Sequence, residues 1–222
     1  MTGSSPAIAS SLLEELQQRQ RACTKCADAG LIRAAHPVFS GRAGQRIMLV
    51  GQAPGPEEID QNRPFAGRAG RQLMRWLVPV FGDEISVRDR VYITSTTTCF
   101  PGRRPDGSGD RRPGGAEVAM CAPWLDGVLE LLAPRLVLPV GGLALTRLLG
   151  ASRRLDDVIG LLLTPAGGAV DAPRPGDTRL LLPLPHPSGQ SRWLNDPGRL
   201  ALLQKALTRL PELVRWAEFG DS

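Results

Sequence analysis

Hydrophobic residues along the chain fall into two kinds of segment: short unbroken apolar runs, and longer stretches in which apolar positions recur every three or four residues. The short runs end at Gly, Pro or polar residues, which is typical of buried strands that lead into loops. We predict four such strands, at 46–51, 91–94, 135–140 and 180–184. The longer stretches predict helices from Ser11 to just before Cys23 and at 67–81, 117–132, 143–149 and 199–210. A continuation of the last helix past Pro211 is the alternative to an end at 210.

The alternation of strands and helices predicts the fold. Short apolar strands separated by amphipathic helices favour a parallel sheet that is covered on both faces. We therefore predict an α/β protein, a three-layer α/β/α fold around a central, mostly parallel four-stranded sheet. We expect a single domain over 1–222, to which a metal site attaches the N-terminal helix and cysteine segment at 10–30. Because Ser11-Leu12-Leu13-Glu14 matches a capping box, this helix is expected to start at Ser11, with Leu12, Leu13 and Leu16 on one side.

The loops that follow the strands are expected to carry the chemistry, because ligands of parallel α/β sheets bind at the carboxyl ends of the strands. The small residues Gly51, Ala53 and Gly55 allow the backbone to approach a ligand closely. Phe65 can stack against a flat ring, although a role as an ordinary core aromatic is the alternative. The loops in question are 51–65, 95–115 and 186–195.

The composition is that of a globular protein. The chain has 222 residues, of which 42% are hydrophobic and 22% charged, and its apolar runs are far shorter than the roughly 20 residues that cross a bilayer. The first thirty residues lack the pattern of a secretion signal, so we expect a cytoplasmic protein that does not associate with membranes.

The net charge of +5 indicates an anionic partner. All but two of the 27 basic residues are Arg, and the planar Arg fork matches phosphate oxygens. A coding bias toward Arg, Ala, Gly and Pro would give the same totals, so the charge alone does not decide for nucleic acid.

The four cysteines suggest one metal site. Cys23 and Cys26 form a CxxC pair, Cys99 lies at a predicted strand end, and Cys121 lies inside a predicted helix. Four thiolates suit an iron–sulfur cluster or a structural zinc ion, and the spacing does not separate the two. Four buried cysteines without a metal are the alternative.

Four short motifs occur in order along the chain: Gly51-Gln52-Ala53-Pro54-Gly55, Arg63-Pro64-Phe65-Ala66-Gly67, Tyr92-Ile93-Thr94-Ser95 and His186-Pro187-Ser188. Together with the cysteines, they resemble the uracil-DNA glycosylase superfamily, and specifically its iron–sulfur families four and five. The resemblance extends roughly from Cys23 to Leu210. It implies a monomeric DNA repair enzyme that flips uracil out of single- or double-stranded DNA and hydrolyses the N-glycosidic bond, which leaves an abasic site.

The resemblance also implies roles for individual residues. The four cysteines would hold a [4Fe–4S] cluster, Phe65 would stack on the flipped uracil, and His186 would donate a hydrogen bond to uracil O2 as the bond breaks. Glu58 matches an acid that crowds the C5 position of the base. The substrate-binding residues would be Gly51, Ala53, Gly55, Glu58, Phe65 and Ser95.

Two residues depart from the family-four pattern. Gln52 replaces a Glu and orients water without accepting its proton, which implies a largely dissociative path in which the bond breaks first. Ser95 replaces an Asn that reads the uracil edge. Substrate breadth, including hypoxanthine and xanthine, is therefore open.

Two loops are predicted to contact DNA. One lies between Cys99 and Cys121, and the other follows His186; the residues are Arg103, Arg104, Arg111, Arg112, Ser188, Arg192 and Trp193. Arg binds phosphates without regard to sequence, and an apolar side chain fills the gap left by a flipped base. The alternatives are a solvated Arg surface and a Trp193 that packs its loop onto the domain.

Two other functions remain open on the sequence alone. Because Gln52 and Ser95 depart from the pattern, the chain could be a binding module for damaged or single-stranded DNA that does not hydrolyse it. The fold alone would also suit a nucleotide-binding protein with structural zinc.

Overall fold

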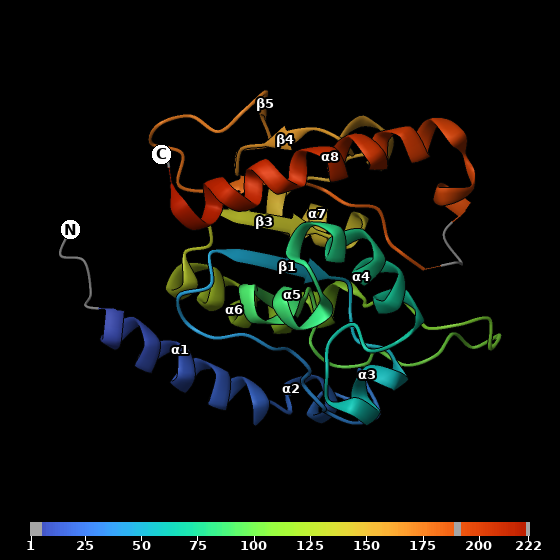
Figure 1. Cartoon of the computed structure of the whole chain (residues 1–222). Helices are drawn as coiled ribbons and strands as arrows, with labels where there is room; N and C mark the ends of the chain where they lie inside the picture. The colour runs from blue at the N-terminus through green and yellow to red at the C-terminus, as the bar shows by residue number, and fades with distance from the viewer. Residues whose placement is uncertain (1–5, 189–191, 221–222) are drawn as a thin grey trace.

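The computed structural model describes residues 6–188 and 192–220, which are arranged around one six-stranded sheet (Figure 1). The strand order is β2-β1-β3-β6-β4-β5. The strands are β1 (Ile47–Gly51), β2 (Val91–Ser95), β3 (Leu136–Pro139), β4 (Leu162–Leu163), β5 (Ala169–Val170) and β6 (Leu180–Leu181). The first four in this order are parallel, whereas β4 runs antiparallel to both of its neighbours.

The four predicted strands are thus confirmed, and the prediction of a four-stranded sheet was incomplete. Strands β4 and β5 have two residues each, which is too short for any period in the sequence to show. Every residue of β1 and β2 is buried. Strands covered on both faces are rich in apolar residues, and this explains the unbroken hydrophobic run of β1.

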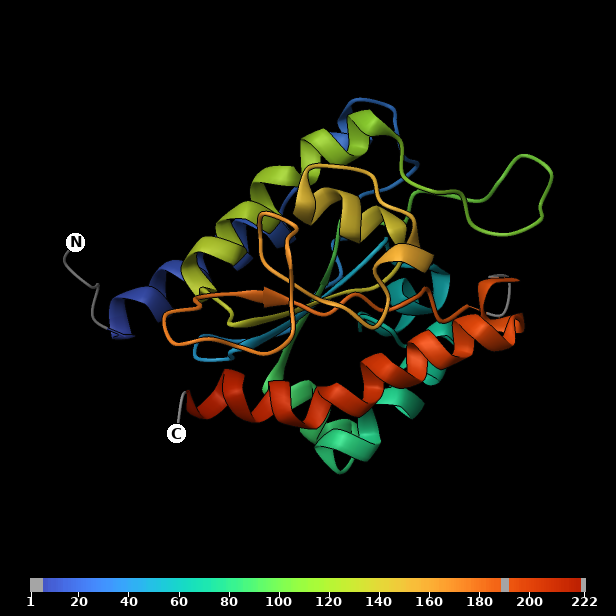
Figure 2. The same ribbon diagram turned by 90° about the horizontal axis from the view of Figure 1, so that it is seen from above.

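The helices form two layers. They are α1 (Pro6–Arg21), α2 (Lys25–Asp28), α3 (Pro56–Gln61), α4 (Arg68–Phe81), α5 (Glu84–Arg90), α6 (Gly115–Leu132), α7 (Gly142–Leu149) and α8 (Pro197–Phe219), with 3₁₀ turns at Leu155–Asp157 and Arg192–Asn195. Figure 2 shows α8 and α6 on opposite sides of the sheet. None of the helices in the described part of the chain is long and apolar enough to cross a membrane.

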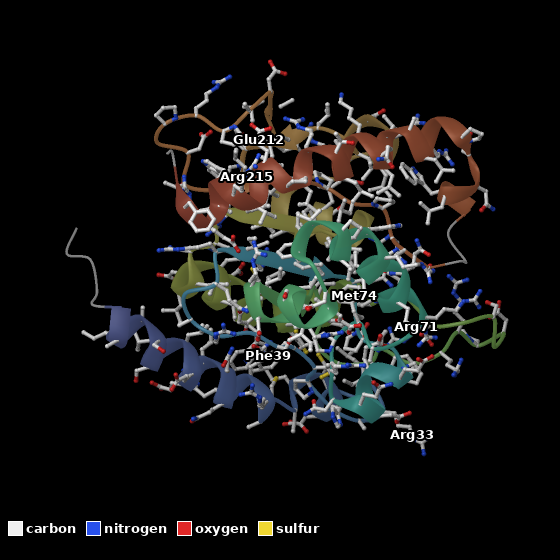
Figure 3. The ribbon with its side chains drawn as sticks, viewed as in Figure 1. Arg33, Phe39, Arg71, Met74, Glu212 and Arg215 are labelled. Atoms are coloured by element: carbon white, nitrogen blue, oxygen red, sulfur yellow. The ribbon has the colours of Figure 1, made fainter. Side chains whose placement is uncertain are left out.

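Alternate residues of the strands divide the core into two clusters. Ile47 and Leu49 of β1 pack with α4, α5 and α8, whereas Met48 and Val50 pack with α1, α6 and α7. This is the period of two that a pleated strand imposes, and it confirms the three-layer prediction. On α4, Met74 is buried in the first cluster while Arg71 lies on the surface (Figure 3).

The N-terminal helix differs from the prediction at its start. Helix α1 extends back to Pro6, so Ser11 lies inside it and does not cap it. Pro suits the first turn of a helix, because the N–H that it lacks has no partner there. Leu13 and Leu16 contact the body, but Leu12 is 44% exposed. A β-carbon on Gly127 of α6 would lie 2.9 Å from the Leu16 side chain, so α1 packs closely on α6 by direct contact.

Candidate active site and cysteine pocket

The carboxyl ends of the parallel strands open into one cleft with a volume of about 800 Å³. Loops that follow β1, β2 and β6 line it, as the position of the strand ends predicts. The predicted residues that line this cleft are Gln52, Ala53, Gly55, Glu58, Phe65, Ser95, Arg103, Arg104, Arg111, His186 and Ser188. Residues separated by more than 130 positions in the sequence therefore meet in one site.

Gly51 allows the ring of Phe65 to lie against the end of β1. Gly51 pairs with Ser95 in the sheet register. A β-carbon on Gly51 would lie 2.8 Å from Phe65 Cζ and 3.1 Å from Ser95 Oγ, so any larger residue would displace the ring. The floor of the cleft thus brings together a backbone segment, an aromatic ring and a hydroxyl group.

Phe65 has an unusual backbone conformation, with a φ of 53°. This left-handed region costs a non-glycine residue roughly 1–2 kcal/mol, so the surrounding structure must hold it there. Gly70 of α4 is one such neighbour, because a β-carbon there would lie 1.9 Å from the Phe65 carbonyl oxygen. The close approach of helix to loop requires glycine at this position.

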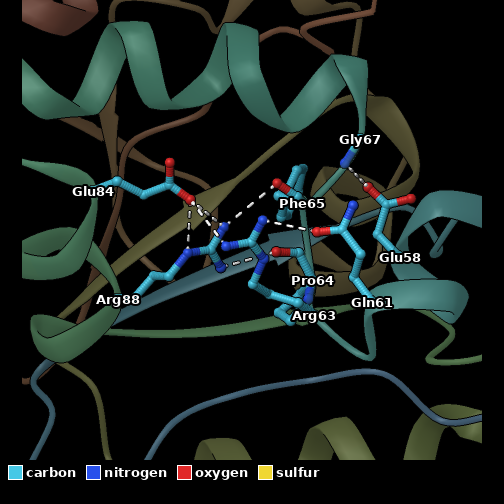
Figure 4. Close-up of polar contacts among 8 residues, drawn as sticks. All are labelled: Glu58, Gln61, Arg63, Pro64, Phe65, Gly67, Glu84 and Arg88. Carbon is cyan, nitrogen blue, oxygen red and sulfur yellow. Dashed lines mark hydrogen bonds and ion pairs between the residues drawn. The ribbon is translucent and has the colours of Figure 1, made fainter.

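Glu58 joins the two loops that surround Phe65. Its Oε2 accepts a hydrogen bond from the Gly55 N–H at 2.9 Å, and its Oε1 accepts one from the Gly67 N–H at 2.8 Å. Figure 4 shows the contact with Gly67. Both carboxylate oxygens thus have backbone partners, and the side chain fixes the distance between the loop after β1 and the start of α4.

His186 has a defined tautomer. The Ser188 N–H donates to Nδ1 at 3.3 Å, and Ser188 Oγ lies 3.0 Å from the same nitrogen. Because a backbone N–H can only donate, Nδ1 is the acceptor and the ring hydrogen belongs to Nε2. Burial lowers the pKa of His186, so the ring is neutral at neutral pH. A neutral imidazole with its hydrogen on Nε2 can donate a hydrogen bond to an anion that forms in the cleft.

Gln52 and Ala53 follow β1 and line the cleft. The Thr97 N–H donates to the Gln52 carbonyl oxygen at 3.2 Å, which ties this loop to the one after β2. The Gln52 amide is half-buried and supplies both a donor and an acceptor to the cleft.

The Arg-rich loop folds back on itself over the cleft. Arg103 and Asp110 form an antiparallel bridge, and the Arg104 N–H donates to the Gly109 carbonyl oxygen at 2.8 Å. A β-carbon on Gly55 would lie 3.2 Å from Asp110 Oδ2, so this carboxylate stands against the loop after β1. Asp110 was not predicted as a site residue, because an isolated acid in a polar loop gives no signal in the sequence.

Arg111 has a different surrounding from the one predicted for a DNA contact. Its guanidinium donates to both oxygens of Glu117, at 2.7 and 2.6 Å, and to the Leu31 carbonyl oxygen at 2.8 Å. The Glu117 side chain is 6% exposed. Arg111 is therefore engaged in holding the loop to α6 and to the cysteine segment, whereas Arg103, Arg104 and Arg112 are exposed.

The loop after His186 is described only in part, because 189–191 lie outside the described residues. Trp193 is 9% exposed, and its indole N–H donates to Asp156. This is the packing arrangement that was the alternative for Trp193, and a contact with DNA would require the side chain to leave Asp156. Arg192 begins the 3₁₀ turn, and its side chain, which was predicted to contact DNA, lies outside the described part of the structure.

All four cysteines line a second pocket. Cys23 follows α1, Cys26 lies in α2, Cys99 follows β2, and Cys121 lies in α6. Burial is the main cause that raises the pKa of Cys99 to about 12, and the electrostatic effect of the other three cysteines adds to it. The four thiols thus line one pocket, in which Cys121 is buried and the other three cysteines are half-buried.

The polar groups around this pocket suit a metal centre with sulfur ligands. Thr98 Oγ1 lies 3.7 Å from Cys121 Sγ, while the buried Thr97 Oγ1 and Trp124 Nε1 have no hydrogen-bond partner. Both residues line the pocket, and polar groups of this kind suit sulfur acceptors. Among the described residues, no group of three or more His, Cys, Asp or Glu side chains is placed to hold a metal ion, so the pocket itself does not separate an iron–sulfur cluster from zinc.

Comparison with known proteins decides the family. The family model described as the uracil DNA glycosylase superfamily matches residues 39–210, which include both the cleft and two of the four cysteines. The chain belongs to the uracil-DNA glycosylase superfamily. The resemblance found in its motifs is thereby confirmed.

Several individual relatives of this superfamily member are similar over part of their length. A type-4 uracil-DNA glycosylase of Sulfurisphaera tokodaii is 32% identical over 58% of this chain and 54% of the relative. A type-4 enzyme of Thermotoga maritima is 33% identical over 61% of this chain and 65% of the relative. A type-5 uracil-DNA glycosylase of Pyrobaculum aerophilum is 32% identical over 50% and 53%. The matched region thus spans between half and two thirds of these relatives.

Proposed function

We propose that this chain removes uracil from DNA by hydrolysing the N-glycosidic bond. The observation that carries the proposal is the pairing, in one cleft, of Phe65 with a neutral His186 whose hydrogen is on Nε2. An aromatic face suits a flat base, and a fixed donor suits the charge that a departing base acquires. The names of the related type-4 enzymes support the same activity.

In the proposed reaction the base leaves before water adds. The flipped uracil stacks on Phe65, and both electrons of the glycosidic bond pass to the base, whose O2 accepts the hydrogen bond from His186 Nε2. The Gln52 amide positions a water molecule that adds to the cationic sugar carbon, and the proton of that water passes to solvent. Gln52 does not act as a base, so leaving-group stabilisation carries most of the acceleration.

Ser95 sets the proposed base selectivity. Its hydroxyl lies beside Phe65 at the end of β2 and is shorter than an amide. A hydroxyl that rotates serves more than one pattern of donors and acceptors. We propose hypoxanthine and xanthine as candidate substrates beside uracil. Ser95→Asn should narrow the range of released bases toward uracil.

We also propose that Cys23, Cys26, Cys99 and Cys121 hold a [4Fe–4S] cluster. When bound, this group supplies a rigid cationic connection between thiolates and takes no part in bond breaking. The orphaned polar groups of Thr97 and Trp124 support the proposal. We expect about four irons and four sulfides per chain, measured after anaerobic purification; stoichiometric zinc without iron would overturn it.

DNA contact is proposed for the exposed arginines of the loop after β2. Arg103 and Arg104 line the cleft, and Arg112 is an exposed cation on the same loop. Phosphate contacts of this kind depend on salt. Exchanging the three for Gln should weaken binding to uracil-containing and undamaged DNA alike and reduce the salt slope. An unchanged slope would assign the loop to the solvated surface. We further propose that the enzyme is a monomer, that it folds as a single domain and that it acts in the cytoplasm.

The decisive test is release of free base from defined strands. The purified chain is incubated with single- and double-stranded DNA that carries uracil, hypoxanthine or xanthine, and the released base is separated from the strand. We expect uracil release from at least one form. Tight binding to uracil DNA without release would instead favour the binding module, which the absence of a carboxylate at Gln52 keeps as the second candidate.

A further inference from the structure

Arg88 of α5 holds the backbone on which Phe65 stands. Its Nη1 donates to the Pro64 carbonyl oxygen at 3.0 Å, and its Nη2 donates to the Phe65 carbonyl oxygen at 3.5 Å (Figure 4). The two carbonyl groups belong to consecutive peptide units directly at the aromatic residue. A planar guanidinium with two parallel donors matches such a pair.

Glu84, one helical turn earlier, fixes the orientation of Arg88. Its Oε1 accepts from Arg88 Nε at 2.9 Å and from Nη2 at 2.8 Å. The Arg88 side chain is only 18% exposed, so solvent screens these contacts less than those of a free surface cation. The guanidinium is therefore directed at the loop by its own helix.

The segment from Pro64 to Gly67 is held from both sides. Arg88 binds the carbonyl groups at its start, and Glu58 accepts the Gly67 N–H at its end. Between them, Phe65 keeps its left-handed φ of 53°. Because this conformation is costly for a bulky residue, it persists only where neighbouring groups impose it. Removing Arg88 would let the peptide relax and turn the ring away from the end of β1.

We propose that Arg88 is a positioning residue that acts through Phe65 to align the stacking ring for base excision. The proposal rests on the proposed function, and it adds a residue that lies outside the four recognised motifs and does not line the cleft. Charge alone does not suffice for this role, since a Lys ammonium cannot serve Glu84 and both carbonyl groups in one plane. Misplacement of a reacting group by about 1 Å costs about 100-fold in rate, which sets the expected scale.

The test compares Arg88→Gln and Arg88→Lys with a matched control. Arg42→Gln removes the same charge from an ion pair with Asp89, the neighbour of Arg88 in the chain, at a site that is 66% exposed. We expect Arg88→Gln to slow single-turnover uracil release by roughly 10- to 100-fold. Arg88→Lys should fall between Gln and the parent. The affinity of the Arg88 variants for undamaged DNA should stay within about threefold of the parent. The rate of uracil release by Arg42→Gln should also stay within about threefold of the parental rate.

A double-mutant cycle with Phe65→Ala separates positioning from general stability. If Arg88 acts through Phe65, then Arg88→Gln has little further effect in the Phe65→Ala background, because the aligned group is already absent. Equal losses in both backgrounds would overturn the proposal. So would a folded Arg88→Gln variant with the parent rate. If Arg88→Gln does not fold, Glu84→Gln takes its place in the same cycle.

Amide hydrogen exchange distinguishes a failure of this inference from a failure of the proposed function. If the parent chain releases no base, the function fails, and Arg88 is then judged by exchange alone. We expect faster exchange over 63–70 in Arg88→Gln than in the parent or in Arg42→Gln. Unchanged exchange in that segment would overturn the role of Arg88, whether or not the chain is active.

Discussion

Removing the Glu58 carboxylate tests whether this side chain joins two loops or excludes thymine by crowding the C5 position of the base. In the structure its two oxygens accept the Gly55 and Gly67 N–H groups at 2.9 and 2.8 Å. Hydrogen bonds to a charged group contribute about 1.5–3 kcal/mol each when fully buried, and less here because Glu58 is half-buried. We expect Glu58→Ala to lose about 2 kcal/mol of unfolding free energy. Glu58→Gln should lose about 1 kcal/mol, because its amide nitrogen would face one backbone N–H.

The assay combines urea unfolding with single-turnover release of uracil and of thymine. If Glu58 joins the loops, both variants lose stability and uracil release falls, since Phe65 lies between Gly55 and Gly67. Glu57→Gln is the control, because Glu57 is exposed and pairs only at 3.4 Å with Arg71. The reasoning would be refuted by variants with parental stability that excise thymine. That result would show that Glu58 crowds the C5 position of the base, the role that the family resemblance implies.

Three further predictions follow from single contacts. Tyr92 is the only tyrosine in the sequence, and burial raises its pKa to about 12, so phenolate absorbance of the folded chain should appear only near that pH. The free energy of unfolding should fall above the ordinary pKa of 10.0, because the phenol ionises first in the unfolded chain. A titration of the native protein near pH 10 would contradict this. Gly70→Ala should lower both stability and uracil release, because its β-carbon would meet the Phe65 carbonyl oxygen. This would outweigh the roughly 1 kcal/mol by which Ala normally favours a helix over Gly. An active variant with a raised melting temperature would show that the loop moves to accommodate the β-carbon. Arg111→Gln should lower the free energy of unfolding in urea by about 3 kcal/mol, because Glu117 stays buried without its cationic partner. The salt slope of DNA binding should change little. Parental stability with a reduced salt slope would instead identify Arg111 as a phosphate contact.

The parallel core could be predicted because its signals are local. Strand β1 is buried along its whole length and its apolar run marks it directly, while β-branched and aromatic residues mark β2. The end of α8 had two alternatives in the sequence, at 210 or beyond Pro211. The structure confirms the second, since the helix continues through Pro211 to Phe219 and its buried side recurs at Leu213 and Ala217. Tertiary packing there outweighs the cost of an internal proline.

The candidate site could be predicted as a set of residues but not as a set of contacts. Topology brings strand ends together, so the motifs of the cleft were expected to meet. The partner of each charge depends on the fold, and no local pattern indicated that Arg111 would bind Glu117 or that Arg88 would bind the Pro64 carbonyl oxygen. For Trp193, the partner Asp156 lies 37 residues away, which hides the packing role from the sequence.

Single-turnover uracil release by the parent chain and by His186→Ala tests the central claim most directly. Ser188 fixes the hydrogen of His186 on Nε2, so the side chain is expected to stabilise the departing base. Loss of such a donor should slow release by about 10²–10³-fold while leaving DNA affinity nearly unchanged. Release by His186→Ala at the parental rate, or no release by the parent chain, would contradict the account.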